Sequence, residues 1–167
     1  CHEWSPDGRQ IAYLSAQRGD PALFTVEPDT GSVRKRTDIQ TTGLLGCPAW
    51  SRDGRHMAIL QGPADQATFL FDPARGWTEQ TIDRLPAHPD GLFVPRAWSP
   101  DGRVLAGTVT NALVLYPPDA RTFRTVASIP PITSASILEW LPDGARLIAQ
   151  GTAPRLYLID VVRGQAT

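Results

Sequence analysis

The sequence lacks the short motifs that commonly mark an enzyme, a metal protein or a membrane protein. It contains no G-x-S-x-G nucleophile elbow, no H-E-x-x-H pair, no C-x-x-C pair and no P-loop. No apolar run approaches the roughly 20 residues that cross a bilayer. No segment keeps the apolar period of about 3.6 residues that marks an amphipathic helix. We therefore expect little helix, no catalytic residue, no cofactor and no direct membrane insertion of this segment.

Charge of one sign, histidine and cysteine are scarce as well. The formal net charge of −1 gives no electrostatic reason to expect nucleic acid as a partner. The three histidines, His2, His56 and His88, are scattered, and we expect no metal site. Cys1 and Cys47 occupy equivalent places in neighbouring repeats. Equivalent places usually lie farther apart than the roughly 7 Å between Cα atoms that a disulfide allows, so we expect free thiols.

Turn residues and one repeated phrase are abundant. The 16 prolines and 14 glycines are spread along the chain, which favours many short strands. The phrase reads WSPDGR at 4–9, WSRDGR at 50–55, WSPDGR at 98–103 and WLPDG at 140–144. Its tryptophans, Trp4, Trp50, Trp98 and Trp140, are separated by 46, 48 and 42 residues. Those periods are typical of a four-stranded propeller blade.

Each phrase has the chemistry of a tight hairpin. Pro6 presets the first φ angle, Asp7 can bond its own backbone, and Gly8 supplies a positive φ. The predicted structural turn residues are Asp7, Gly8, Asp53, Gly54, Asp101, Gly102, Asp143 and Gly144. The predicted structural core residues are Trp4, Trp50, Trp98 and Trp140, because repeats bury the same residue between neighbours.

Strand-forming segments follow each phrase. The segments directly after the turns are 10–15, 56–60, 104–109 and 146–151, and the later ones are 22–37, 68–82, 112–127 and 155–167. Each later segment begins with an apolar strand and continues into a turn, and the first three resume in a further strand, such as TEQTI at 78–82. The fourth has little room for that last strand.

The fold class predicted from this pattern is an all-β propeller of four-stranded antiparallel blades. We predict a single propeller over residues 1–167, with repeat units of about 1–46, 47–93, 94–136 and 137–167. About 3.5 to 4 blades are present on this count, and an open arc of blades leaves unpaired edges. We therefore expect a fragment of a larger propeller, with a self-closed four-blade ring as the alternative.

The phrase WSPDGR followed by IA, with a later strand and an acidic-to-glycine turn, resembles the TolB-like family of β-propeller repeats, also called WD40-like. The resemblance covers nearly the whole chain as four tandem units. Three positions depart from it: Arg52 replaces the turn proline, Leu141 the phrase serine and Ala145 the usual basic residue. Asp and Gly remain in every unit, so the hairpins are retained. The family includes periplasmic members, which favours an extracytoplasmic location.

Binding residues of propellers usually lie in the non-repeating loops, because loops on a rigid scaffold carry function. The predicted polar rim comprises Asp20, Asp65, His88 and Asp90, and the predicted apolar contact patch comprises Leu44, Leu45, Leu92 and Phe93.

Three functions fit these observations. The first is a non-catalytic interaction or sensor module that binds a protein, peptide or small ligand. The last blade resembles those of propellers fused to bacterial kinases or winged-helix regulators, which implies the sensor arm of a signalling protein. The second is the substrate-gating propeller of a serine peptidase similar to prolyl oligopeptidases and dipeptidyl peptidases. The third is a solitary small propeller with its own ligand. We expect a protein or peptide partner, and open blade edges predict self-association.

Overall fold

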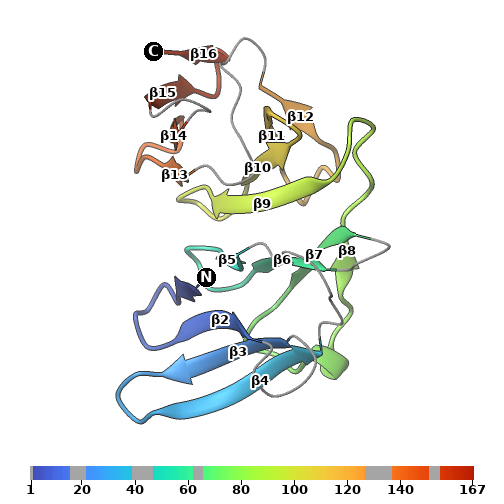
Figure 1. The fold of residues 1–167 in the computed structure, drawn as a ribbon, viewed down its shortest axis with the longest axis vertical. Coiled ribbons are helices and arrows are strands. Elements are labelled where there is room, and N and C mark those ends of the chain that lie inside the picture. Colours follow the sequence, from blue (N-terminus) through green and yellow to red (C-terminus); the bar gives the residue numbers. More distant parts are fainter. Residues whose placement is uncertain (1, 16–21, 39–46, 62–65, 127–136, 151–154) are drawn as a thin grey trace. The chain divides into compact units, whose positions relative to one another are not determined.

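The blades follow one another along the chain as four-stranded sheets. The computed structural model describes residues 2–15, 22–38, 47–61, 66–126, 137–150 and 155–167. Within these residues the strands form four antiparallel sheets of four strands each, and in every sheet the spatial order follows the chain order (Figure 1). We number these sheets blade 1 to blade 4. Blades 1 and 2 belong to one compact unit, Cys1–Leu85, and blades 3 and 4 to a second, Pro86–Thr167.

Unit 1 holds the first two blades. Blade 1 contains β1 (His2–Trp4), β2 (Ile11–Ser15), β3 (Ala22–Glu27) and β4 (Ser32–Asp38). Blade 2 contains β5 (Ala49–Trp50), β6 (Met57–Gln61), β7 (Ala67–Phe71) and β8 (Asp83–Arg84), with a short 3-10 turn, η1 (Trp77–Glu79), before β8. The innermost strands β1 and β5 lie near each other.

Unit 2 holds the last two blades. Blade 3 contains β9 (Phe93–Trp98), β10 (Leu105–Val109), β11 (Ala112–Tyr116) and β12 (Arg124–Thr125). Blade 4 contains β13 (Leu138–Trp140), β14 (Arg146–Gln150), β15 (Leu156–Asp160) and β16 (Gln165–Ala166). The predicted fold class, an all-β propeller with four-stranded antiparallel blades, is confirmed. That the four blades form a single propeller domain stays a prediction.

Two local expectations are wrong. The segment 78–82 does not continue as a strand, because Trp77 packs edge-on against Phe71 with ring centroids 5.2 Å apart. The Gln80 side chain then bonds both the amide and the carbonyl of Asp72, at 2.7 and 2.9 Å. Blade 4 does have a fourth strand. Its turn needs few residues, because Gly164 takes a φ of 65° and lets β16 pair with β15 at once.

Cys47 is disulfide-bonded, so the expectation of a free thiol at this position is wrong. Cys1 lies outside the described residues. The expectation rested on the usual distance between equivalent positions of neighbouring repeats. Strands nearest the centre of a propeller converge, as β1 and β5 do, so equivalent positions there approach more closely than elsewhere in the blades.

The phrase hairpins repeat one hydrogen-bond network in blades 1 to 3. In blade 1 the Ser5 hydroxyl donates to Asp7 Oδ1 at 2.6 Å and accepts from the Gln10 amide at 2.8 Å. The Arg9 amide also donates to Asp7 Oδ1, at 3.0 Å. Ser51 with Asp53, and Ser99 with Asp101, repeat the same bonds. The network explains why serine, aspartate and glycine recur together in the phrase.

Blade 4 closes the same hairpin with different bonds, because Leu141 stands where the other blades have serine. Asp143 Oδ1 accepts from the amides of Ala145 and Arg146 at 2.9 and 3.0 Å. The guanidinium of Arg146 pairs with the other carboxylate oxygen at 2.6 Å. The exposed ion pair of Arg146 with Asp143 therefore closes the turn in blade 4, whereas a partly buried serine hydroxyl closes it in blades 1 to 3.

Apolar clusters join the two blades of each unit. In unit 1 the buried members are Ala12, Leu23, Met57, Ile59 and Phe71. In unit 2 they are Ala106, Leu113, Leu115, Val126, Leu138, Trp140, Leu147, Ala149, Ile159 and Val161. The cluster of unit 1 relies more on partly buried residues, among them Trp50, Phe69 and Trp77. The interface between blades 1 and 2 therefore contains fewer fully buried apolar side chains than the interface between blades 3 and 4.

Candidate functional site

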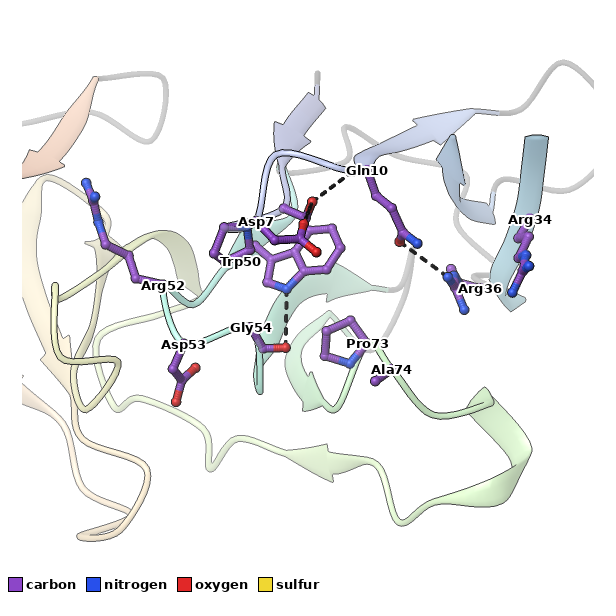
Figure 2. Close-up of a pocket in the computed structure, with 12 residues that line it drawn as sticks. Asp7, Gln10, Arg34, Arg36, Trp50, Arg52, Asp53, Gly54, Pro73 and Ala74 are labelled. Carbon is purple, nitrogen blue, oxygen red and sulfur yellow. Dashed lines mark hydrogen bonds between the residues drawn. The ribbon is translucent and has the colours of Figure 1, made fainter. Parts of the chain in front are cut away.

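A cavity of about 670 Å³ lies between blades 1 and 2, and we call it the inter-blade cavity. Its walls come from the phrase hairpins of both blades, from strand β4 and from the turn after β7. Figure 2 shows the indole of Trp50 near its centre, with Arg34 and Arg36 on one side and Arg52 on the other. The lining thus combines one aromatic ring with three guanidinium groups.

Arg36 is the half-buried cation of this cavity. Its Nε donates to the Thr25 hydroxyl at 2.9 Å, and its Nη2 donates to Gln10 Oε1 at 3.4 Å (Figure 2). Burial lowers the pKa of the Arg36 guanidinium, the positive charge of Arg34 lowers it further, and the negative charge of Glu27 raises it in part. Arginine remains protonated in proteins in spite of such shifts. Arg36 is therefore a permanent positive charge held by two neutral side chains.

The negative charges of the cavity are already engaged. Asp7 and Asp53 belong to the phrase hairpins, and each accepts hydrogen bonds from a serine hydroxyl and from the amide two residues later. The Ser5 hydroxyl and the Arg9 amide lower the pKa of Asp7. Burial raises the pKa of Asp53, but the bonds from Ser51 and Arg55 outweigh it and the net shift is downward. Both carboxylates are ionised at neutral pH and fixed within their turns.

Within the described residues, no ion pair joins Arg34, Arg36 or Arg52 to a carboxylate. The turn aspartates neutralise part of the charge of the cavity without contacting these guanidinium groups. Three cations against two anions leave the lining with a net charge of +1. The cavity therefore has the electrostatics of a site for one negative charge.

Trp50 is turned toward its own hairpin. Its indole N–H donates to the carbonyl of Gly54 at 3.5 Å (Figure 2). In unit 2 the equivalent Trp140 donates instead to the carbonyl of Ala97 in the preceding blade, at 3.2 Å. The indole of Trp140 thus bridges two blades, whereas that of Trp50 leaves the interface beside it open.

A second, smaller cavity of about 340 Å³ lies in unit 2 beside the turn that joins β10 to β11. His88 and Asp90, two predicted rim residues, line it together with Thr110 and Asn111. The Asp90 amide donates to His88 Nδ1 at 3.1 Å. The His88 ring also stands edge-on to Phe123, with centroids 5.2 Å apart. The structure therefore places His88 and Asp90 together beside the smaller cavity.

The other six predicted rim and contact-patch residues lie outside the described residues, are half-buried or are buried. Asp20, Leu44, Leu45 and Asp65 lie outside the described residues. Leu92 is half-buried. Phe93 is a correction, because it is buried at 4% exposure and packs near Tyr116 and Phe123. As the first residue of β9 it points into the blade rather than to the rim.

The phrase tryptophans differ in burial although their sequence context is the same. Trp98 and Trp140 are buried at 4% and 6% exposure, and Trp50 is half-buried. Trp4 is 50% exposed, so its assignment to the core is wrong. Trp4 lies in blade 1, and no earlier blade of this chain covers it within the described residues. The aspartates and glycines of the phrases all lie in the hairpin turns, where the glycines take φ between 66° and 75°.

Sequence reasoning missed Gln10, Arg34 and Arg36 as site residues. A signal for two of them exists in the repeat itself, since Gln10 and Arg36 stand where blade 3 has Val104 and Val126. A polar residue at a position that is apolar in another repeat indicates an interface that is not filled by apolar side chains alone.

Among the described residues, no group of three or more His, Cys, Asp or Glu side chains is placed to hold a metal ion. Nor does that part of the chain contain a helix long and apolar enough to span a bilayer.

The family model described as eukaryotic translation initiation factor eIF2A matches residues 14–162. The chain belongs to this family. The match begins in β2 and ends after β15, so it includes parts of all four blades, and the resemblance to TolB-like, WD40-like propeller repeats is confirmed.

The Tol-Pal system protein TolB of Alcanivorax borkumensis is 40% identical over 57 residues, which are 34% of this chain and 13% of that protein. The uncharacterized peptidase YuxL of Bacillus subtilis is 40% identical over 57 residues, 34% of this chain and 8% of that protein. The crystal structure of TolB from Acinetobacter baumannii superposes with a TM-score of 0.76 at 20% identity. It covers 99% of this chain, which spans 42% of that one. A protein assigned to TolB from Agrobacterium tumefaciens has the same TM-score at 18% identity, and this chain spans 62% of it.

Proposed function

We propose that this chain is a non-catalytic propeller module that binds a protein or peptide. The observation that carries the proposal is the inter-blade cavity, whose lining combines an aromatic ring with guanidinium groups that form no ion pair with a carboxylate among the described residues. A cavity of this volume falls in the range of small-molecule and side-chain binding pockets. The Ser5 hydroxyl and the Asp7 carboxylate in its lining are bonded to each other and to backbone amides within the hairpin turn, so binding is the chemistry that we propose for it.

We further infer an extracytoplasmic place for this module in a bacterial cell. Two of the relatives carry the name Tol-Pal system protein TolB, which describes a member of a protein assembly. The disulfide of Cys47 supports the inference, because disulfides persist in oxidising compartments. Within that setting, the module serves as the sensor arm of a larger signalling protein.

A second candidate function is the gating of substrates for a serine peptidase. The match to the peptidase YuxL of Bacillus subtilis is the observation that favours it. In this case the propeller filters peptides and a separate hydrolase domain cuts them. Sequencing the coding DNA on both sides of this segment separates the two functions, since only the second needs a neighbouring domain with a G-x-S-x-G motif.

Self-association through blade faces and edges is part of the proposal. Ile148 and Leu156 of blade 4 are exposed, whereas Ala106, at the place of Ile148 in blade 3, is fully buried. Exposed strand faces and edges of this kind recruit other strands or blades. Light scattering of the isolated chain should therefore show species larger than a monomer.

The experiment that tests the binding function is selection of a random peptide library on the immobilised 167-residue chain. We expect a consensus motif, and synthetic peptides that carry it should bind with dissociation constants in the range of about 1 to 100 μM. Failure to enrich any motif would contradict a peptide-binding module. Hydrolysis of a selected peptide by the chain, abolished by one side-chain change, would contradict its non-catalytic character.

A further inference from the structure

We propose that the inter-blade cavity binds a carboxylate side chain of an acidic peptide segment, with Arg34 and Arg36 as its cations and Trp50 as the packing surface for the neighbouring residue. This inference rests on the proposed function and specifies the ligand of that module.

The first argument is the unused hydrogen-bonding capacity of Arg36. Its bonds to Thr25 and Gln10 engage Nε and Nη2, and Nη1 has no partner among the described residues. Guanidinium groups bind carboxylates through two parallel N–H donors, and such charge-assisted bonds are about twice as strong as neutral ones.

The second argument is that the fold does not require the polar network around Arg36 at this interface. Thr25, Arg36 and Gln10 stand where blade 3 has Leu115, Val126 and Val104. Strand register supports the equivalence of Thr25 with Leu115 and of Arg34 with Arg124, since Thr25 pairs with Arg34 in blade 1 and Leu115 pairs with Arg124 in blade 3. Arg36 follows Arg34 by two residues, as Val126 follows Arg124, and it lies at a bulge of β4 between Lys35 and Thr37. The three blade 3 residues belong to or pack against the apolar cluster of unit 2. The fold thus tolerates a fully apolar interface at this place, and burying a cation there instead costs free energy that a bound anion would offset.

The third argument concerns the neighbouring arginine, whose equivalent in unit 2 has a structural bond. Arg124 of blade 3 donates from Nη1 to the carbonyl of Val161 in blade 4, at 3.1 Å. Arg34 is its equivalent in blade 1, and it is exposed beside Pro73 and Ala74 without such a bond among the described residues. Arg34 and Arg36 also lie close enough for their charges to repel each other. A carboxylate between them would relieve that repulsion.

The charge of the lining favours a carboxylate over a phosphate. Asp7 and Asp53 stay ionised in the walls, and their turn bonds keep both pKa values low. They reduce the net charge of the lining to +1, which suits one monoanionic group. A phosphate that carries close to two negative charges at neutral pH would be repelled by the same two aspartates. Trp50 adds an apolar surface, which fits a peptide better than a small inorganic anion.

The test uses NMR titration of the full 167-residue chain, with the indole N–H of Trp50 and the Nε–H of Arg36 as reporters. The probes are the capped tripeptides Glu-Leu-Glu and Gln-Leu-Gln and inorganic phosphate. We expect Glu-Leu-Glu to shift both reporters in a saturable way, even at a roughly millimolar affinity, and to bind about tenfold more tightly than Gln-Leu-Gln. Arg34→Gln and Arg36→Gln should each weaken binding about five- to tenfold.

Arg103→Gln is the matched control, because Arg103 is an exposed arginine that follows a phrase hairpin of unit 2, outside the cavity. It should leave binding unchanged. If Arg36→Gln does not fold, Arg34→Gln decides, since the Arg34 side chain is exposed and carries no described structural bond.

Three outcomes overturn the inference. Equal binding of the two tripeptides would show that no carboxylate is recognised. Tighter binding of phosphate than of Glu-Leu-Glu would make the cavity a general anion site. Library peptides that bind but shift only resonances around His88 and Asp90 would refute the cavity while leaving the binding function intact. A chain that selects no peptide at all would instead refute the proposed function.

Discussion

Trp50 and Trp140 occupy the same place in the repeat, and comparing the interfaces around them shows how one blade design produces a core in unit 2 and a cavity in unit 1. Trp140 is 6% exposed and bonds the preceding blade, whereas Trp50 bonds its own turn beside the inter-blade cavity. The two phrases share their Trp, Asp and Gly and differ at Ser51, Arg52 and Arg55, where blade 4 has Leu141, Pro142 and Ala145. The surface offered by the preceding blade differs as well, and it is Val126 with Leu115 in unit 2 and Arg36 with Thr25 in unit 1.

The comparison teaches that a cavity in a repeat fold can arise from a few interface positions outside the Asp and Gly of the repeat phrase. Blades 1 to 3 keep the serine–aspartate turn network, blade 4 closes its turn with Arg146, and every blade keeps the same order of four antiparallel strands. A long cationic side chain at one position then prevents close packing of the two blades. Repeat proteins are stabilised largely by contacts between neighbouring repeats, so such a position trades stability for an accessible binding surface.

The largest expected effect comes from moving the polar residue of unit 1 into unit 2. Val126→Arg places a guanidinium at a position that is 2% exposed and surrounded by apolar side chains. An uncompensated buried charge costs about 3–5 kcal/mol, and we expect the free energy of unfolding of unit 2 to fall by that amount. Urea unfolding followed by amide resonances of each unit measures it. Val33→Arg, at a valine of unit 1 that is 44% exposed, is the control and should change little.

The reverse change sharpens the same prediction. Replacing Gln10, Thr25 and Arg36 by the residues of blade 3, as Gln10→Val, Thr25→Leu and Arg36→Val together, should fill the inter-blade cavity. Well-packed apolar residues in place of buried polar ones are often neutral or stabilising, so stability should not fall. A stable Val126→Arg variant, or a triple variant that loses stability, would mean that the two interfaces are not equivalent in the way that the register indicates.

The next effect concerns the two tryptophans. Trp140→Ala removes a buried ring and its bond to Ala97, and should destabilise unit 2 by about 3–5 kcal/mol. Trp50→Ala should cost about half as much, because the ring is half-buried and its bond to Gly54 is long at 3.5 Å. Denaturant unfolding of each variant gives both values. Equal losses would show that the interface of unit 1 is as closely packed in solution as that of unit 2.

The smallest effect is the pH dependence of the hairpins. The Ser99 hydroxyl and the Arg103 amide hold the pKa of Asp101 below its ordinary value of 3.8. A depressed pKa in the folded state stabilises the fold above pH 3.8, and this contribution is lost as the pH falls through the lower folded value. Ser99→Ala should therefore cost about 0.5–1 kcal/mol at neutral pH, allowing for the exposure of Asp101, and less in acid.

Blade 4 provides the comparison for that pH experiment. The Ala145 amide and the Arg146 side chain lower the pKa of Asp143, and Leu141 contributes no hydroxyl. Leu141→Ala should therefore leave the acid dependence of stability unchanged, which chemical unfolding at several pH values can check. A stability loss in Ser99→Ala that stays constant from neutral pH to acid would show that the bond to Asp101 carries no part of it.

Much of the fold could be predicted from the sequence because the turns are local. Ser5, Asp7 and Gly8 lie within a few residues of one another, and their bonds close inside the hairpin. The prediction failed at 78–82 because the side chains of Trp77 and Gln80 bond and pack against residues near the end of β7. It failed at Cys47 because the convergence of inner strands is a property of the assembled blades.

The candidate site could be predicted only in part. His88 and Asp90 were found because a loop of polar residues between two units stands out from the repeat, and the structure places both beside one cavity. Phe93 was assigned to the rim because it follows that loop, yet it begins a strand whose side chain is buried. Arg36 and Gln10 were missed because they lie inside the repeat, 26 residues apart, and meet only when blade 1 is folded.

The sequence by itself determined the blades. Four phrases at blade spacing specify where the chain turns, since aspartate and glycine, with serine in blades 1 to 3, close each hairpin through bonds within it. Tertiary structure alone decided which tryptophan became core and which came to line a cavity. Trp50 and Trp140 begin the same repeat phrase and share its Asp and Gly, but their packing partners come from the preceding blade, about one repeat away, and only folding sets Arg36 beside one and Val126 beside the other.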